Sequence, residues 1–216
     1  MKGNIKKLSV FAMIAAITMF TVVGMALADG HHGKNTIQGE YAVTAGMSCF
    51  VSPLGFDGNL TPINPGLGLA TCNSITFQGI STFNRDGTGR LDTTGVLIAP
   101  PPVPSPQLPH ASAFQFSFAF TYDVADDDTI TIDANENSFQ VTFVTGPPVP
   151  GGVGFTSDKY SLSGMVSADH KTLTLGSPTT LIQTLTFQPP PIPVQQGIPN
   201  SSYVLIRLGP IERGGE

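Results

Sequence analysis

The sequence contains no tryptophan and only four tyrosines, and charged residues make up 12% of its 216 positions. Basic residues are scarce, because ten lysines and arginines stand against fifteen acidic residues. A protein that binds nucleic acid or an anionic membrane surface needs clustered basic side chains to neutralise phosphates. The sequence has no such cluster, and we therefore expect no nucleic-acid partner.

The sequence also lacks the short motifs that carry catalytic chemistry. It contains no G-x-S-x-G, no H-E-x-x-H and no phosphate-binding loop motif. His110 follows a proline-rich segment and His170 lies in a predicted turn, and the sequence shows no catalytic partner for either. We assign no catalytic residue, and a protein that is not an enzyme is favoured.

One long hydrophobic run is present, at the start of the chain. Leu8–Met25 carries no charge, follows three lysines and ends at Ala26-Leu27-Ala28, which has the small residues of a cleavage site. This pattern predicts an export signal over residues 1–28 and a periplasmic or secreted mature protein. A retained transmembrane anchor is the alternative, but a bilayer span usually needs about 20 apolar residues.

The sequence after residue 28 predicts one domain with short tails. Residues 29–36 are polar and glycine-rich, which is typical of a mobile N-terminal tail. Residues 37–210 form the predicted barrel domain, and residues 211–216 form a C-terminal tail. No second membrane span is expected, so the mature chain is predicted not to insert in a membrane by a helix.

Cleavage after Ala28 would create a metal-binding N-terminus. The mature chain would begin Asp29-Gly30-His31, and its free amine, two backbone amides and the His31 ring would offer four nitrogens. Square-planar nitrogen ligation suits Cu(II) or Ni(II), and His32 could add a ligand. The arrangement resembles the amino-terminal copper and nickel site of serum albumins. The alternative is a solvated tail without a metal.

A second candidate metal site lies among acidic residues that would suit Ca2+. Asp133-x-Asn135-x-Asn137 matches the opening of a calcium loop, but Ser138 and Val144 stand where glycine and glutamate are needed. Turn-forming aspartates and asparagines explain the same residues without an ion. The full cluster is Asp123, Asp126, Asp127, Asp128, Asp133, Asn135, Glu136 and Asn137. We expect no other cofactor.

The chain has two cysteines, Cys49 and Cys72. A lone pair in an oxidising compartment usually forms a disulfide, and we predict that bond. A redox or metal-binding thiol pair is the alternative, but the spacing matches no C-x-x-C or zinc pattern.

Side chains alternate between apolar and polar along much of the chain. In Phe114–Tyr122 five aromatic residues fall on one face, which a strand permits and a helix does not. The pattern slips after Gly79, which predicts a bulge there. Asp86-Gly87 marks a hairpin turn. The residues expected inside are Phe77, Phe114, Phe116, Phe118, Phe120, Phe139, Phe143 and Phe187.

These runs predict an all-β fold, a single antiparallel β-barrel of about eight to ten strands. A two-sheet β-sandwich is the alternative, because alternation is the same in both. Three connections are rich in proline: residues 100–109, 147–150 and 189–199. They can be polyproline ligands for a partner or stiff loops that end strands, and a binding rim would be built there.

The two ends of the predicted barrel resemble those of lipocalins and related calycins. Gly39-Glu40-Tyr41 opens the first run at the position of the family's Gly-x-Trp, and Arg207 lies in the last run at the position of its basic residue. The resemblance implies that Arg207 packs across the Tyr41 ring.

Three functions remain open on this evidence. The first is binding of a small apolar ligand, or of a partner at the proline-rich loops. The second is a structural or surface-interaction role with an interior filled by side chains. The third is an outer-membrane barrel, although the shortage of tryptophan and tyrosine argues against its aromatic girdles. The oligomeric state is not predicted.

Overall fold

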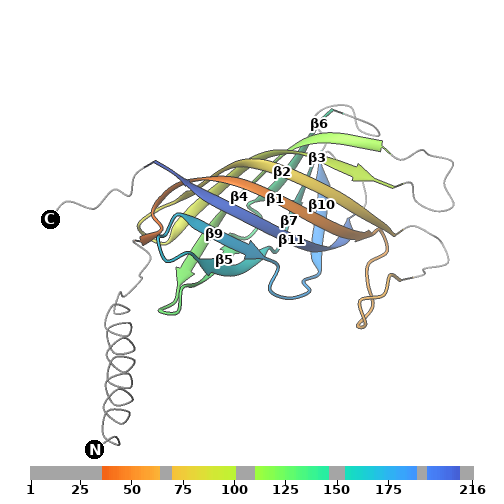
Figure 1. Cartoon of the computed structure of the whole chain (residues 1–216). Coiled ribbons are helices and arrows are strands. Elements are labelled where there is room, and N and C mark those ends of the chain that lie inside the picture. The colour runs from red at the N-terminus through yellow and green to blue at the C-terminus, as the bar shows by residue number, and fades with distance from the viewer. Residues whose placement is uncertain (1–35, 64–69, 101–109, 146–153, 189–193, 210–216) are drawn as a thin grey trace, which may run out of the picture. The chain divides into compact units, whose positions relative to one another are not determined.

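The computed structural model describes residues 36–63, 70–100, 110–145, 154–188 and 194–209. These residues form one antiparallel sheet of eleven strands (Figure 1). The strands are β1 (Gly39–Ser52), β2 (Thr71–Phe83), β3 (Thr88–Ala99), β4 (His110–Val124), β5 (Thr129–Ala134), β6 (Phe139–Thr145), β7 (Gly154–Ser157), β8 (Ser161–Val166), β9 (Thr172–Gly176), β10 (Gln183–Gln188) and β11 (Gln195–Leu208). Within the same ranges no helix is long and apolar enough to cross a membrane.

The sheet closes on itself, as the barrel prediction requires. Strands β1 to β4 pair in chain order, and β11 returns to pair with β1 from Glu40 opposite Leu208 to Ser52 opposite Gln196. At one end the ring runs β1-β2-β3-β4-β5-β8-β9-β11, and at the other it runs β1-β2-β3-β4-β6-β7-β10-β11. The antiparallel barrel is therefore confirmed over the sandwich.

The barrel has eleven strands and not eight to ten, because part of its wall is built from shorter strands. Five strands run the length of the barrel: β1, β2, β3, β4 and β11. Between β4 and β11, each position in the wall is shared by two short strands, one at each end of the barrel: β5 and β6, then β8 and β7, then β9 and β10. We call this line of interruptions the seam. The predicted loop at 189–199 is wrong at its end, because β11 begins at Gln195 and contains Pro199.

Pro199 is tolerated in β11 because it lies at the seam. β10 pairs with β11 only up to Gly197, and β9 pairs with it only from Ser202. A proline has no backbone N–H to donate to a ladder. At Pro199 the neighbouring strand is absent on that side, so no ladder hydrogen bond is lost there.

The alternating phenylalanines of β4 point inward, as predicted. Phe116 and Phe118 are each only 2% exposed. The predicted bulge at Gly79 is wrong, because β2 keeps its register with both neighbours through that residue. Ile80 is instead 39% exposed on the outer face, and Ser81 takes the buried position at 2%. The hydrophobic pattern alone therefore predicted the wrong inward-facing positions in β2 after Gly79.

The predicted disulfide is also wrong. Both cysteines are free, with Cys49 buried and Cys72 exposed. The register pairs Cys49 with Asn73 and Phe50 with Cys72, so the two cysteines occupy successive rungs of neighbouring strands. Successive residues of a strand point to opposite faces, and the two sulfurs are therefore separated by the sheet.

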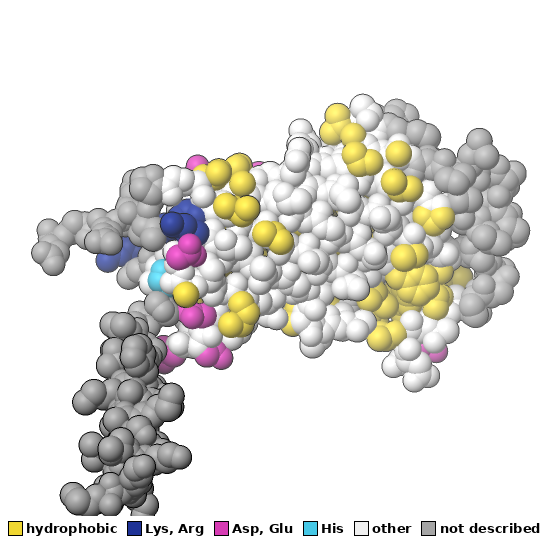
Figure 2. All heavy atoms as spheres, in the orientation of Figure 1, with side chains coloured by type: hydrophobic (Ala, Val, Ile, Leu, Met, Phe, Trp, Pro, Cys, Tyr) yellow, Lys and Arg dark blue, Asp and Glu magenta, His cyan; other side chains and the backbone are white. Residues whose placement is uncertain are grey.

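The two ends of the barrel have different connections. At the closed end, short turns at residues 84–87, 125–128 and 167–171 join β2 to β3, β4 to β5 and β8 to β9. At the open end, longer segments join β1 to β2, β3 to β4, β6 to β7 and β10 to β11 (Figure 1). Figure 2 shows acidic and basic side chains gathered mainly toward the closed end.

Several predictions fall on residues outside the described ranges. These are the export signal at 1–28, the tail at 29–35 with the Asp29 and His31 metal site, and the tail at 211–216. Of the proline-rich segments, residues 101–109, 147–150 and 189–193 lie outside these ranges as well. These predictions stay predictions.

Candidate functional site

The closed end is blocked by Tyr41 and Arg207, the pair suggested by the lipocalin resemblance. The guanidinium carbon of Arg207 lies 5.2 Å from the centre of the Tyr41 ring, and Arg207 Nε donates to the Tyr41 hydroxyl at 3.2 Å. The Tyr41 hydroxyl donates in turn to the backbone carbonyl of His170 at 3.1 Å. Burial raises the pKa of Tyr41, although Arg207 opposes that shift. The arrangement ties β1, β11 and the β8–β9 turn together.

Aromatic rings fill the barrel next to this pair. Phe83 packs against Tyr41, Phe120 and Tyr122 with ring centres 5.1 to 5.3 Å apart. Each edge-to-face pair contributes about 0.5–1.5 kcal/mol beyond simple burial. The Tyr122 hydroxyl also donates to the backbone carbonyl of Asn84. The closed half therefore leaves no path into the interior.

The middle of the barrel contains a buried polar group surrounded by rings. The hydroxyls of Tyr160 and Tyr203 share a short hydrogen bond, and Tyr160 also donates to Ser201 Oγ at 3.0 Å. Burial raises the pKa of Tyr160 and of Tyr203, so both phenols stay protonated at neutral pH. Phe116, Phe118 and Phe139 surround Tyr160. This layer separates the closed half from the open half.

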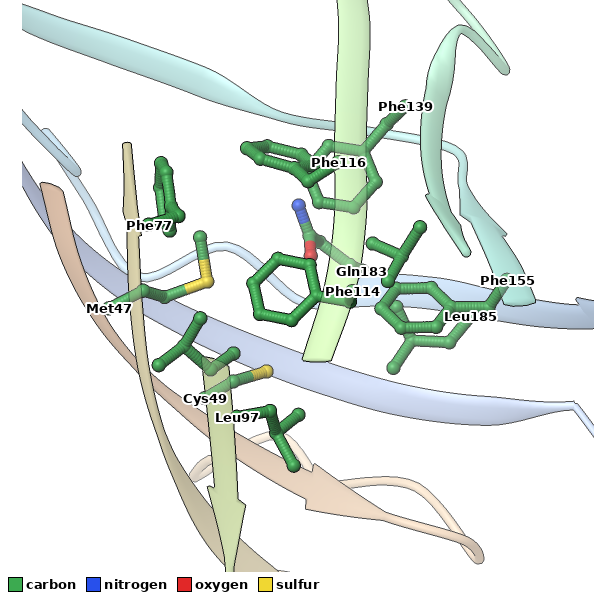
Figure 3. A pocket seen from close by; sticks show the side chains of 12 residues that line it. Met47, Cys49, Phe77, Leu97, Phe114, Phe116, Phe139, Phe155, Gln183 and Leu185 are labelled. Atoms are coloured by element: carbon green, nitrogen blue, oxygen red, sulfur yellow. The ribbon is translucent and has the colours of Figure 1, made fainter. Parts of the chain in front are cut away.

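Beyond the tyrosine layer, toward the open end, lies an apolar cavity of about 40 Å³ (Figure 3). Its walls come from β1, β2, β3, β4, β6, β7 and β10. The lining residues are Met47, Cys49, Ile75, Phe77, Leu97, Phe114, Phe116, Phe139, Val141, Phe155, Gln183 and Leu185. Three of them, Ile75, Leu97 and Phe155, are only partly buried, so the cavity lies close to the open end.

Gln183 is the only lining residue with a side-chain oxygen or nitrogen. Its side chain is 2% exposed, and its Nε2 donates a short hydrogen bond to the backbone carbonyl of Lys159. That carbonyl is accessible because Lys159 lies between β7 and β8, at the seam. Gln183 Oε1 accepts no hydrogen bond from the described residues. This amide oxygen is therefore an acceptor that is free to take a hydrogen bond from a ligand in the cavity.

A second unsatisfied oxygen lies in the open half. Asn73 Oδ1 is buried and has no hydrogen-bond partner within the described ranges. Asn73 is on β2, directly opposite the cavity residue Cys49 on β1. Burial raises the pKa of the Cys49 thiol to about 12, so this sulfur is neutral and unreactive at neutral pH. The open half thus combines apolar walls with two acceptors that lack donors.

The predicted acidic cluster is spread over strands β4 and β5 and the two turns that follow them. Asp127 Oδ1 accepts from the Thr129 backbone N–H at 3.1 Å in the closed-end turn, and Asn137 has a φ of 58° in the turn after β5. In the part of the chain that the structure describes, no three histidine, cysteine or acidic side chains form a group able to hold a metal ion.

Sequence reasoning missed Gln183 and Asn73 as site residues. The signal for Gln183 was present, because it shares the inward phase of Leu185 and Phe187 on β10. An amide at an inward position predicts either a structural hydrogen bond or a polar contact for a ligand. No comparable sign for Asn73 is present in the sequence, because the lack of a donor for its side-chain oxygen depends on the neighbouring strands.

Comparison with known proteins gives no assignment. The sequence matches no protein-family model, and no curated protein matches it. What is established is therefore the architecture: a closed antiparallel barrel, plugged at one end and carrying a small apolar cavity at the other.

Proposed function

We propose that this protein is an exported, non-enzymatic barrel that binds a slender apolar molecule at its open end. The ligand would carry one hydrogen-bond donor, such as the hydroxyl of a fatty alcohol. The observation that carries the proposal is the Gln183 amide, whose Oε1 accepts no hydrogen bond from the described residues and whose side chain lines the apolar cavity.

The size of the cavity limits what can enter. Sites for drug-sized ligands occupy about 300–1,000 Å³, whereas this one has about 40 Å³. Only the narrow end of a molecule fits without movement of the walls. Met47 and Leu97 line the cavity, and methionine adapts its shape readily. The rest of the ligand would extend toward the loops of the open end.

The small volume also favours a second function. A barrel filled by its own side chains would serve as a structural or surface-interaction protein, with the proline-rich loops as contacts. This candidate predicts that the interior admits no ligand at all. The filled layers around Phe118 and Tyr160 support it.

The outer face of β4 argues against the membrane barrel. Membrane barrels present an apolar band to lipid and a polar interior. Here the phenylalanines of β4 point inward, while its outward positions carry Gln115, Ser117, Ala119 and Thr121. That is the arrangement expected of a barrel in water.

The test compares 1-decanol with its methyl ether, which cannot donate a hydrogen bond. Displacement of an apolar fluorescent dye would measure the affinity of the full-length protein for each. We expect the alcohol to bind about fivefold more tightly, the value of one net hydrogen bond. Gln183→Leu should remove this preference while the ether still binds.

Two results would count against the proposal. Failure of the dye, the alcohol and the ether to bind would leave the filled structural barrel as the better function. Binding without any effect of Gln183→Leu would place the ligand elsewhere. Thr186→Val is the matched control, because Thr186 lies on the exposed face of the same strand.

A further inference from the structure

An uncharged row of polar side chains crosses the outer face of five strands. The register places Thr44 opposite Gln78, Gln78 opposite Thr94, Thr94 opposite Gln115 and Gln115 opposite Thr142. All five side chains are exposed. We call these residues the outer row. Hydroxyls and amides therefore alternate across β1, β2, β3, β4 and β6 at successive strand positions.

The outer row lies in a depression of the barrel wall. Two hollows of about 710 and 520 Å³ adjoin there and share Gln78, Thr94 and Gln115. Both are far larger than the interior cavity of about 40 Å³. Both hollows are open to solvent, and the outer wall therefore offers more room than the interior for an extended polar ligand.

Glycines beneath the outer row account for its concave shape. Gly79 and Gly95 lie at inward positions, and a Cβ on either would come within 2.1 and 2.4 Å of the backbone oxygens of Asp92 and Thr76. Because glycine removes these collisions, the strands can approach and bend toward the core at this point. These two glycines thus allow the barrel wall to be concave at the outer row.

The chemistry of the outer row selects a neutral ligand. None of its five side chains has a hydrogen bond to another described side chain. The nearest charges belong to Arg90 and Asp92 on β3, which pair with each other at 2.7 Å. Glutamine amides and threonine hydroxyls both donate and accept. A neutral ligand that presents donors and acceptors along its length complements them.

We propose that the outer row binds a neutral glycan chain that lies across the strands. Hydroxyl groups are the repeating donors and acceptors of such a chain. Strands lie about 4.8 Å apart, so five of them offer a path long enough for several sugar units. The phenylalanines that border the hollows point inward, so hydrogen bonds and not ring stacking would hold the chain. Affinity in the millimolar range is expected for such contacts.

The experiment is an NMR titration of the labelled full-length chain with neutral hexasaccharides. Cellohexaose and maltohexaose are the probes, with an oligogalacturonate of similar length as an anionic comparison. We expect one neutral probe to shift the side-chain amide signals of Gln78 and Gln115. The anionic chain should shift them less, because the row has no positive charge to attract it.

Two variants and a control make the result specific. A Cβ at Gly46 meets no atom within 4 Å, so Gly46→Leu should fold normally and fill part of the larger hollow. This variant and the double variant Gln78→Ala/Gln115→Ala should each weaken binding at least tenfold. Thr131→Val should bind as the parent does, since Thr131 is exposed on β5, outside the two hollows.

Several outcomes would overturn the proposal. They are an absence of shifts at the outer row with both neutral probes, undiminished binding by Gly46→Leu, or equal binding of the anionic chain. Shifts that depend on protein concentration without any probe would assign the hollow to a second copy of the chain. Dye displacement at the open end should be unchanged in Gly46→Leu, so this test stands apart from the proposed interior site.

Discussion

The closed and open ends of this barrel differ in charge, connections and packing. In the strand segments of the open half, such as 46–52, 71–77 and 183–188, no lysine, arginine, aspartate or glutamate occurs. The four open-end connections add a single acidic residue, Asp57. At the closed end, by contrast, Asp86, Asp127 and Asp169 each accept hydrogen bonds within a tight turn.

This difference between the two ends shows that tight packing and accessibility are located at opposite ends of one continuous sheet. Short turns and a plug of rings packed edge to face fix the strands at the closed end. The open end has longer connections, a small void and a buried oxygen without a donor, that of Asn73. The proposed binding of a ligand at the open end is consistent with this looser packing. Stability is therefore expected to be concentrated at one end and accessibility at the other.

The largest effect should follow removal of a ring from the closed end. Phe83 is 1% exposed and contacts three other rings, so Phe83→Ala should lower the free energy of unfolding by about 4 kcal/mol. Phe155→Ala, at the partly exposed edge of the open-end cavity, should cost less than half as much. Urea unfolding followed by circular dichroism measures both. Equal losses would mean that the two ends are packed equally well.

The second effect concerns alkaline pH. All four tyrosines lie in the closed half or the central layer, and burial raises the pKa of each, that of Tyr122 to about 12. A folded-state pKa above the unfolded value of about 10 gives stability that is complete below pH 10 and lost as pH rises further. Tyrosinate absorbance should therefore appear together with unfolding above pH 10. Early titration of a tyrosine in the folded protein would contradict the burial described for these rings.

The third effect compares the two thiols of the open half. Cys72 is exposed, whereas Cys49 is buried with its pKa raised to about 12. A thiol-specific aromatic disulfide reagent should modify Cys72 in the folded protein and reach Cys49 only after unfolding. Cys72→Ser should abolish the rapid reaction. Two equally slow thiols would indicate that they are bridged or that both are buried.

The smallest effect is expected at the surface ion pair on β3, near the closed end. Arg90 and Asp92 lie 2.7 Å apart, but their side chains are 60% and 56% exposed. Exposed pairs of this kind contribute about 0–1 kcal/mol. Arg90→Gln should therefore change the unfolding midpoint little, and added salt should reduce the difference further. A loss as large as that of Phe83→Ala would show that the pair has a structural role beyond charge.

Particular residues show where sequence reasoning succeeded and where it failed. The period of two in Phe114–Tyr122 predicted an inward stripe, because alternation is a local property of a strand. The bulge predicted at Gly79 was wrong, because it was inferred from hydrophobicity alone, whereas the register of β2 with both neighbours is unbroken there. The disulfide between Cys49 and Cys72 was predicted from the presence of two cysteines and an expected oxidising compartment. The face of the sheet on which each side chain lies, however, depends on how β1 and β2 align.

The candidate sites also combine features that the sequence predicts with features that only the structure shows. Gln183 could be placed on an inward face from its neighbours in β10, but its missing donor depends on the seam that exposes the Lys159 carbonyl. The outer row is invisible in the sequence, because its five residues come from strands that are distant along the chain. Registers between neighbouring strands bring them together, and inward glycines shape the wall beneath them.

The sequence by itself determined the class of fold, the inward phenylalanines and the uncharged character of one half of the chain, since these follow from local period and composition. Only the tertiary structure decided closure into a ring, the seam in the wall, the separation of the cysteines and the two hollows. These features depend on contacts between segments far apart in the chain, where a shift of one residue exchanges the two faces of a strand.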